Sequence, residues 1–283
     1  MLNRAIIVTT PLGPEVLVFD RMRGKERLGQ PFRYEVDVLS KVASVPMDKL
    51  LGERVTVHVD LPPPLPWRYF NGVVTSASYL GPAGDQYRFR LVLEPWLSLL
   101  SLTSRSRSFQ HESVPTGVKE IFREHGFSDI RETITTRKPW EYLVQYRESD
   151  LNFVCRMLEQ EGIYFFFEHD KDKHVLVLAD APSAHKPATG YESIPYYPPQ
   201  EGARREREHF LGWTHVAELC PGSFASRAYD FEDARNRVDV RRSGPRLERK
   251  AGTHEVYDAP GEFRTHEEGD QIALMRLQEL QAE

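Results

Sequence analysis

The sequence predicts a β-rich α+β protein in which two antiparallel, barrel-like β-domains are joined by an α/β insert. Three observations favour this class. Short alternating segments fill the first hundred residues, helical spacing begins at about residue 110, and strand-like segments return after a Pro- and Gly-rich stretch. We therefore expect a first barrel-like domain over residues 1–108, an α/β insert over 109–181, and a second barrel-like domain with a C-terminal helix over 182–283.

The first domain is expected to consist of short strands. Phe32–Leu39 and Val55–Asp60 alternate apolar and polar side chains, as strands with one solvated face do. The further strands expected are Val16–Phe19, Phe70–Tyr79 and Tyr87–Trp96. The prolines Pro62, Pro63, Pro64 and Pro66 indicate an edge or a loop. Many short strands at this spacing favour a closed or nearly closed barrel, which leaves no exposed edge.

Two helices are expected in the insert. Val118, Ile121 and Phe122 have helical spacing and are followed by Gly126, a residue that commonly ends helices. Ser149 can cap a second helix, and Asp150 suits its first turn. The apolar face expected for this second helix is Leu151, Val154, Cys155 and Leu158, with Gly162 at its end.

A hairpin is expected to follow, with strands Ile163–Glu168 and His174–Ala179 around a polar turn. Its three consecutive phenylalanines do not alternate in polarity, so we expect a strand that is covered on both faces, with Phe166 buried. After a linker or long loop over 180–208, strands are expected at Phe210–Leu219 and Ser223–Glu232. The C-terminal helix is expected to present an apolar stripe of Ile272, Met275, Leu277 and Leu280.

Composition excludes several classes of protein. The 283 residues are 40% hydrophobic and 28% charged, which is ordinary for a globular chain of about two domains. The net charge is −5, and the arginines 204, 205 and 207 alternate with acids, so we expect a solvated loop there and no nucleic-acid partner. The two cysteines indicate a reducing compartment, and the N-terminal apolar run is too short for a Sec signal peptide.

The known catalytic and phosphate-binding motifs are missing from the sequence, which has no Gly-rich phosphate loop, nucleophile elbow or HExxH. His169, Asp170, Asp172 and His174 are the best metal candidates, but polar residues are expected at a hairpin tip, so we favour a solvated turn. We therefore expect no metal site and no cofactor.

Paired carboxylates are a second candidate, because a glycosidase can use two acids that are distant in sequence. Glu148, Asp150, Glu159 and Glu161 are dense here, and a charged outer helix face explains them more simply. Cys155 could act as a nucleophile, but its position on an apolar face favours a core residue; Cys220 is expected to be structural. We expect no catalytic residues.

The segment Val144–Asp170, VQYRESDLNFVCRMLEQEGIYFFFEHD, resembles the signature of the VgrG family, the spike or tip proteins of type VI secretion. The resemblance covers essentially the whole chain and is to the family's N-terminal phage-tail-hub-like region, which is related to phage late control protein D. It implies two barrel-like domains around an α/β insert, with three copies forming a ring of pseudo-sixfold inner symmetry. The other segments that resemble the family, in the expected order, are PFRYEVDVLS, LLGERVTVHV, FNGVVTSASYLG, LEPWLSLLSL, SRSFQHESVP, LVLADAPSAH, ELCPGSFASRAYDFED and EVYDAPGEF.

The resemblance implies a structural hub that joins the secretion tube to the puncturing needle and carries effectors out of the cell, without enzyme activity. The partners it implies are further copies of the chain, in a homotrimer of the full-length protein, the tube protein Hcp, effector or tip proteins, and baseplate components. Assembly would be cytoplasmic, followed by secretion or delivery into target cells through the type VI apparatus. Relatives usually continue into a needle, whereas this chain stops at Glu283, so the trimer is expected of the full-length form.

Three alternatives stay open. The first is a baseplate hub or late control protein of a tailed phage, which shares the fold. The second is a carbohydrate-cleaving hydrolase that uses two acids. The third is a carbohydrate- or peptide-binding module with a rim of exposed tryptophans. The candidates for such a rim are Trp67, Trp96, Trp140 and Trp213, although Trp96 is expected to be packed.

Overall fold

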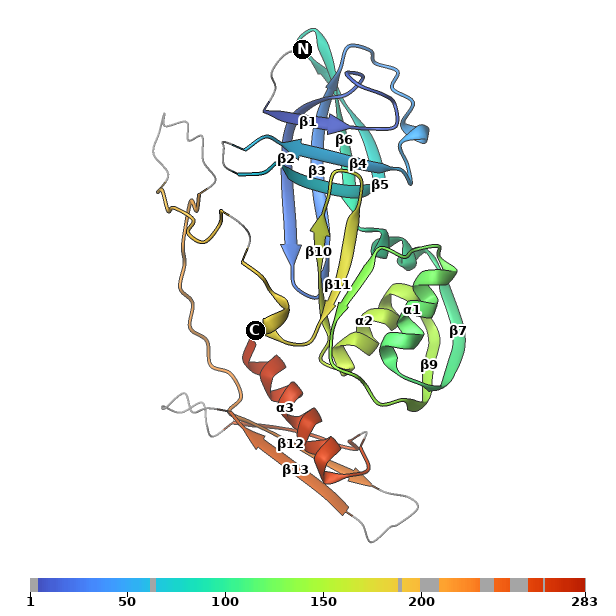
Figure 1. Ribbon diagram of the computed structural model, residues 1–283, viewed down its shortest axis with the longest axis vertical. Helices are drawn as coiled ribbons and strands as arrows, with labels where there is room; N and C mark the ends of the chain where they lie inside the picture. The colour runs from blue at the N-terminus through green and yellow to red at the C-terminus, as the bar shows by residue number, and fades with distance from the viewer. Residues whose placement is uncertain are drawn as a thin grey trace. The chain divides into compact units, whose positions relative to one another are not determined.

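The computed structural model divides the chain into two compact units, residues 1–210 and 211–283. Figure 1 shows the order of their helices and strands along the chain. None of the described helices is both long enough and apolar enough to cross a membrane. The structure describes residues 5–61, 65–187, 190–198, 209–229, 237–244, 254–261 and 263–282.

A curled six-stranded antiparallel sheet forms the first part of unit 1 (Figure 1). Its order is β1-β4-β5-β6-β3-β2, and bulges in β2 and β5 help it to curl into a half-barrel. The alternation predicted for β3 is confirmed, since Phe32, Tyr34, Val36 and Val38 are all buried. The strands are β1 (Ile6–Thr9), β2 (Val18–Arg27), β3 (Gln30–Ser40), β4 (Arg54–Val59), β5 (Arg68–Ala83) and β6 (Gln86–Glu94).

The α/β part of unit 1 contains both predicted helices, α1 (Val114–Glu124) and α2 (Asp150–Gln160). Ser149 caps α2 as predicted, because its hydroxyl accepts a hydrogen bond from the Asn152 N–H at 3.2 Å. The sequence did not predict β7 (Ser104–Glu112) and β9 (Trp140–Ser149), which form an antiparallel pair. A second small sheet has the order β10-β11-β8, with β8 parallel to β11. Its strands are β8 (Ile130–Thr133), β10 (Tyr164–His169) and β11 (His174–Ala179).

One hydrophobic cluster joins the helices to the hairpin and to the preceding 3₁₀ helix, η2 (Trp96–Leu102). Trp96 stacks on Phe127 and meets the edge of Phe122 within it. The shorter 3₁₀ helices are η1 (Met47–Lys49) and η3 (Pro182–Ala184). The domain boundaries expected at residues 108 and 181 both fall inside unit 1, and they stay a prediction.

The burial expected for Phe166 is wrong. Phe165 is 2% exposed and belongs to the cluster, whereas Phe166 is only partly buried. Successive side chains of a strand point to opposite faces, and Phe166 lies on the face where His185 is its neighbour, with the ring centroids 5.0 Å apart. β10 is therefore covered better on its Phe165 face, whereas β11 is buried on both faces, since Leu176 and Val177 are each 0% exposed.

Unit 2 is a three-stranded sheet with one helix. Its order is β13-β12-β14, β14 is parallel to β12, and the apolar side of α3 packs on the sheet through Ala273 and Leu277. The elements are β12 (Ser223–Tyr229), β13 (Arg237–Ser243), β14 (Glu255–Asp258) and α3 (His266–Ala282). The β-rich α+β class with an α/β insert is thereby confirmed.

The strand predicted at Phe210–Leu219 is wrong. Phe210 makes an isolated bridge to Tyr196, and residues 211–222 form no strand ladder with any described segment. An alternating pattern does not by itself make a strand, because the pattern depends on packing against neighbouring strands. Leu211, Val216 and Leu219 are accordingly exposed.

Candidate functional site: buried polar networks in the first unit

His174 on β11 connects the hairpin to the curled sheet. Its Nε2 accepts the Trp96 backbone N–H at 2.9 Å, so the proton lies on Nδ1, which donates to the Asn71 side-chain oxygen at 2.8 Å. Asn71 in turn donates to the Thr56 hydroxyl at 2.7 Å. Burial is the main cause that lowers the pKa of His174 to about 3, with His169 and Arg54 adding to it. The imidazole is therefore neutral at physiological pH.

His169 forms a second link to the same sheet. Its Nδ1 accepts the Asn71 N–H at 3.1 Å, and its Nε2 lies 3.1 Å from the Tyr34 hydroxyl. Tyr34 donates to Glu26 at 2.8 Å, which completes a chain of hydrogen bonds. Burial lowers the pKa of His169 more than the neighbouring Glu26 raises it.

The four metal candidates of the hairpin therefore divide into two kinds. Asp170 and Asp172 are exposed in the turn, as expected, but His169 and His174 belong to the hydrogen-bonded interior, so the solvated-turn interpretation is wrong for the histidines. His169 and His174 are the last paired residues of the two strands, so both side chains point to the same face of the hairpin. Asp170 and Asp172 lie in the turn beyond the strands. Among the described residues, no group of three or more His, Cys, Asp or Glu side chains is placed to hold a metal ion.

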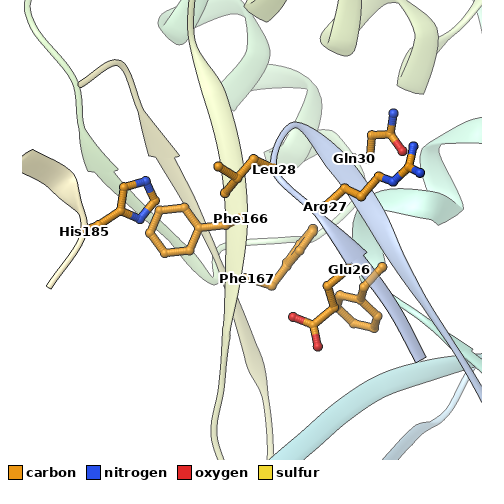
Figure 2. A pocket seen from close by; sticks show the side chains of 8 residues that line it. Glu26, Arg27, Leu28, Gln30, Phe166, Phe167 and His185 are labelled. Atoms are coloured by element: carbon orange, nitrogen blue, oxygen red, sulfur yellow. The ribbon is translucent and has the colours of Figure 1, made fainter. Parts of the chain in front are cut away.

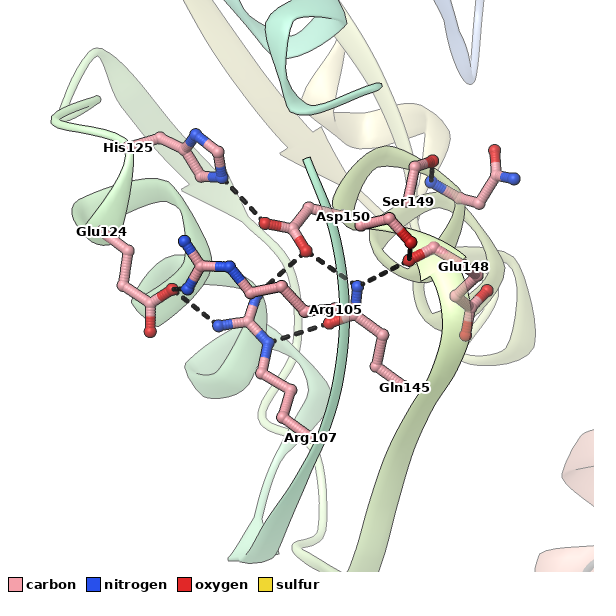
Figure 3. A network of polar contacts seen from close by, with 10 residues as sticks. Arg105, Arg107, Glu124, His125, Gln145, Glu148, Ser149 and Asp150 are labelled. Atoms are coloured by element: carbon pink, nitrogen blue, oxygen red, sulfur yellow. Dashed lines mark hydrogen bonds and ion pairs between the residues drawn. The ribbon is translucent and has the colours of Figure 1, made fainter. Parts of the chain in front are cut away.

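Asp150 lies at the centre of a second network, shown in Figure 3. Its side chain is fully buried and accepts hydrogen bonds from Gln145 at 2.7 Å and His125 at 2.8 Å, with the Arg107 guanidinium at 3.3 Å. Burial raises the pKa of Asp150, but the hydrogen bonds from Gln145 and His125 and the charge of Arg107 outweigh it and lower the pKa overall. The carboxylate is thus held ionised inside the fold.

The network connects four elements. Arg107 on β7 donates to the Gln145 side chain of β9 at 2.8 Å and pairs with Glu124 of α1 at 2.6 Å (Figure 3). Asp150 begins α2, and its backbone N–H donates to the Thr103 carbonyl at 2.9 Å. Because each member has its partners inside the structure, the network fixes the two strands against the two helices.

The charged outer helix face expected for four acids is wrong for Asp150 and correct for Glu159, which is exposed. Glu148 pairs with Arg156. Glu161 accepts the Trp140 indole N–H at 2.7 Å and lies 3.2 Å from the Arg137 guanidinium. These acids serve as structural ion pairs, because their oxygens already face cations or hydrogen-bond donors.

Cys155 is partly buried, and burial, followed by the charge of Glu159, raises the pKa of its thiol to about 11. The thiol is therefore protonated and a poor nucleophile. Cys220 is also partly buried. The arginines 204, 205 and 207 lie outside the described residues.

The four tryptophans have different surroundings. Trp96 is fully buried, as expected, and Trp140 is partly buried with its N–H on Glu161. Trp67 of unit 1 is 40% exposed and meets the ring of His58, and Trp213 is exposed in unit 2. Within unit 1 the structure thus gathers no tryptophan rim from the described residues.

Unit 1 also contains a cavity of about 280 Å³ between the β2–β3 turn and β10 (Figure 2). Phe166, Phe167 and Leu28 supply apolar walls, and Glu26 is already bound by Tyr34. None of the four acids discussed above lines it. The lining residues are Glu26, Arg27, Leu28, Gln30, Phe32, Phe166, Phe167 and His185.

A comparison with protein families identifies the family of the chain. The model of the phage tail baseplate hub family (GPD) matches residues 25–283. The chain belongs to that family. The VgrG resemblance drawn from Val144–Asp170 is also confirmed, because this hub chain is 41% identical over 282 residues to the type VI secretion system spike protein VgrG1c of Pseudomonas aeruginosa, covering 99% of the chain and 38% of that protein.

The chain is also similar to a more distant relative and to a solved structure. The actin cross-linking toxin VgrG1 of Vibrio cholerae is 29% identical over 280 residues, which is 95% of the chain and 25% of that protein. Among solved structures, the type VI secretion component c3393 of E. coli superposes with a TM-score of 0.56 at 24% identity, covering 82% of the chain and 57% of that protein. The hub chain spans about two fifths of the length of the spike proteins that it matches.

Proposed function

We propose that the chain is the hub region of a type VI secretion spike, a non-enzymatic scaffold that joins the secretion tube to the puncturing needle. The observation that carries the proposal is the 41% identity to VgrG1c over 99% of the chain, in a chain that matches the phage tail baseplate hub family. The full-length protein would assemble in the cytoplasm as a homotrimer and leave through the type VI apparatus.

The partners proposed are the tube protein Hcp on one side, the needle and its effector or tip proteins on the other, and baseplate components around them. The internal construction supports a scaffold. The network of His174 ties the hairpin to the curled sheet, and the network of Asp150 ties the two-stranded sheet to the helices, both through buried hydrogen bonds. Such networks favour one rigid arrangement, which a part that transmits force needs.

The assembly is tested by light scattering on the full-length protein at micromolar concentration, with residues 1–283 measured separately. We expect three times the monomer mass for the full-length form and binding of that trimer to rings of the tube protein Hcp in an analytical gel-filtration run. A full-length protein that is monomeric and does not bind the Hcp rings would contradict the hub proposal.

A baseplate hub of a tailed phage is the second candidate, and the family model that matches residues 25–283 favours it. The two hubs differ in the tube that they cap. Purified full-length protein is offered type VI tube rings and phage tail-tube rings in parallel, and preference for the phage rings would select the second candidate.

The absence of enzyme activity is part of the proposal. Its support is that Glu148 and Glu161 face cations and that Asp150 is buried among hydrogen-bond donors. A panel of polysaccharides is incubated with the chain and with Glu148→Gln and Glu161→Gln variants. If the wild type cleaves a polysaccharide and either substitution abolishes that cleavage, the chain is a hydrolase and the scaffold proposal is wrong.

A further inference from the structure

The inner face of the two-stranded sheet of β7 and β9 mixes apolar and polar side chains, because Phe109 and Leu143 join the core cluster on the same face as Gln145. The arginines Arg105 and Arg107 of β7 pair with Glu124 of α1, and Gln145 of β9 is fully buried. The opposite face carries Tyr142, Val144 and Tyr146, which are 61%, 51% and 65% exposed. We call this outer surface the tyrosine face. Its members are Ser108, Gln110, Tyr142, Val144 and Tyr146.

The five side chains of the tyrosine face are uncharged in a chain that is 28% charged, and the next pair in register, Glu112 with Trp140, places a carboxylate beyond one end. Val144 pairs in register with Ser108, and Tyr142 pairs with Gln110, so small or neutral side chains surround the two rings. The nearest cation on β9 is Arg147, whose guanidinium lies 5.3 Å from the centre of the Tyr146 ring, at the end of the face. Exposed aromatic rings on a neutral surface are typical of a binding surface, because tyrosine supplies contact area at a low entropic cost.

The size of the tyrosine face limits what can bind it. The face runs along Tyr142–Tyr146 of β9, so at about 3.4 Å per residue and about 4.8 Å between strands it measures roughly 17 by 10 Å. That is roughly 170 Å², whereas a stable contact between two folded chains needs about 800 Å² on each partner. The face therefore fits a short extended segment better than a second copy of the chain.

The edge of β9 that does not face β7 is partly occupied, which disfavours pairing with a strand of another protein. The Val144 carbonyl points to that edge and already accepts the Arg156 guanidinium at 3.0 Å. Arg156 comes from α2 and also pairs with Glu148, so the middle of the edge is occupied. An extended segment must then lie across the face, where tyrosine hydroxyls can donate to its carbonyls.

We propose that the tyrosine face binds an uncharged, proline-rich segment of another protein in the polyproline II conformation. Such a segment has no strand to complete, its carbonyls are exposed to donors, and its rings pack on aromatic side chains. A neutral ligand also matches the neutral face. About six residues at about 3.1 Å each would span it.

The test uses a fluorescent, uncharged peptide of about ten residues, two thirds proline and one third alanine, titrated with the complete chain and followed by anisotropy. The double variant Tyr142→Ala with Tyr146→Ala is expected to weaken binding at least tenfold, and Val144→Lys, which places a charge on the face, is expected to weaken it too. The matched control is Tyr229→Ala with Tyr257→Ala, which removes two similarly exposed tyrosines of unit 2, at 63% and 57%, and should bind like the wild type.

Four outcomes would overturn the proposal. The first is that the peptide does not bind at millimolar concentrations of the chain. The second is that the control pair weakens binding as much as the Tyr142→Ala, Tyr146→Ala variant does. The third is that a β-forming Thr-Val peptide binds equally well or more tightly, which would indicate strand pairing. The fourth is a chain mass that rises with concentration in the wild type and not in the Tyr142→Ala, Tyr146→Ala variant, which would assign the face to a second copy. Unfolding midpoints establish that all variants are folded before they are compared.

Discussion

The backbone N–H of Trp96 donates to Nε2 of His174 at 2.9 Å, between residues 78 positions apart in the sequence. Both residues are fully buried. The bond connects the start of η2 to β11, and it leaves the imidazole with one tautomer, because the other ring nitrogen donates to Asn71. A backbone donor inside the core thus depends on one side chain for its partner.

Replacement of that side chain should be costly. We expect His174→Ala to lower the free energy of unfolding by about 3 kcal/mol, because a buried backbone donor and the Asn71 side-chain oxygen both lose a partner. Urea denaturation measures the loss. The matched control is His58→Ala, which removes a partly buried histidine that bonds Thr9 at the sheet edge, and we expect less than about 1 kcal/mol from it. Equal losses for the two variants would contradict the role given to His174.

Acidification should destabilise unit 1 through the same residue. His174 has a pKa of about 3 in the folded chain, below its ordinary value of 6.5, so its contribution is fully present above pH 6.5 and is lost as the pH falls toward 3. Between pH 7 and pH 5 the expected loss is about 2 kcal/mol. His169, whose pKa is also lowered, adds to it.

The control for this pH effect is His174→Gln, whose amide can accept from Trp96 and donate to Asn71 without titrating. The urea midpoint of the variant should fall less between pH 7 and pH 5 than that of the wild type. If both lose the same stability over this interval, the titrating group lies elsewhere.

Local signals in the sequence predicted some elements because their causes are local. Ser149 caps α2 through a residue three positions away, and Gly126 and Gly162, with positive φ, follow α1 and α2. The β7–β9 pair was missed for the opposite reason. On the inner face the polar Arg107 and Gln145 stand beside the buried Phe109 and Leu143, and Tyr142 and Tyr146 face outward. The alternation of apolar and polar residues that marks a strand is therefore broken in both segments.

The buried networks were beyond prediction for a related reason. His174 and its partner Asn71 are 103 positions apart, and nothing near either residue marks the contact. The composition of the turn that contains His169 and His174 suits a solvated loop equally well. Phe210–Leu219 has the pattern of a strand, but in the structure Phe210 makes one isolated bridge and residues 211–219 belong to no strand.

Asp150 should be as sensitive as His174. Asp150→Ala leaves Arg107 and His125 without the anion that faces them in a buried site, and we expect a loss of about 3–5 kcal/mol in the free energy of unfolding. Asp172→Ala is the matched control in the same unit, because that carboxylate is 78% exposed and its pair with Lys171 is 3.7 Å long. It should cost less than about 1 kcal/mol. Comparable losses would mean that the buried network adds nothing.

The hairpin offers a direct test of which phenylalanine supports the core. Phe165 is 2% exposed and packs among the residues of the α1–α2 cluster, so Phe165→Ala should lower the free energy of unfolding by about 3–5 kcal/mol. Phe166→Ala removes a partly exposed ring on the opposite face, beside His185 and the cavity, and should cost about 1–2 kcal/mol.

The two variants serve as controls for each other, because they remove the same side chain from neighbouring positions of one strand. Chemical denaturation of both, with the slope compared to establish that the unfolded states are alike, gives the difference directly. A larger loss for Phe166→Ala would mean that the strand is turned the other way. The register that pairs Phe165 with Leu178 and Phe166 with Val177 would then have to shift by one residue, which would also move His169 and His174 out of their hydrogen bonds with Asn71.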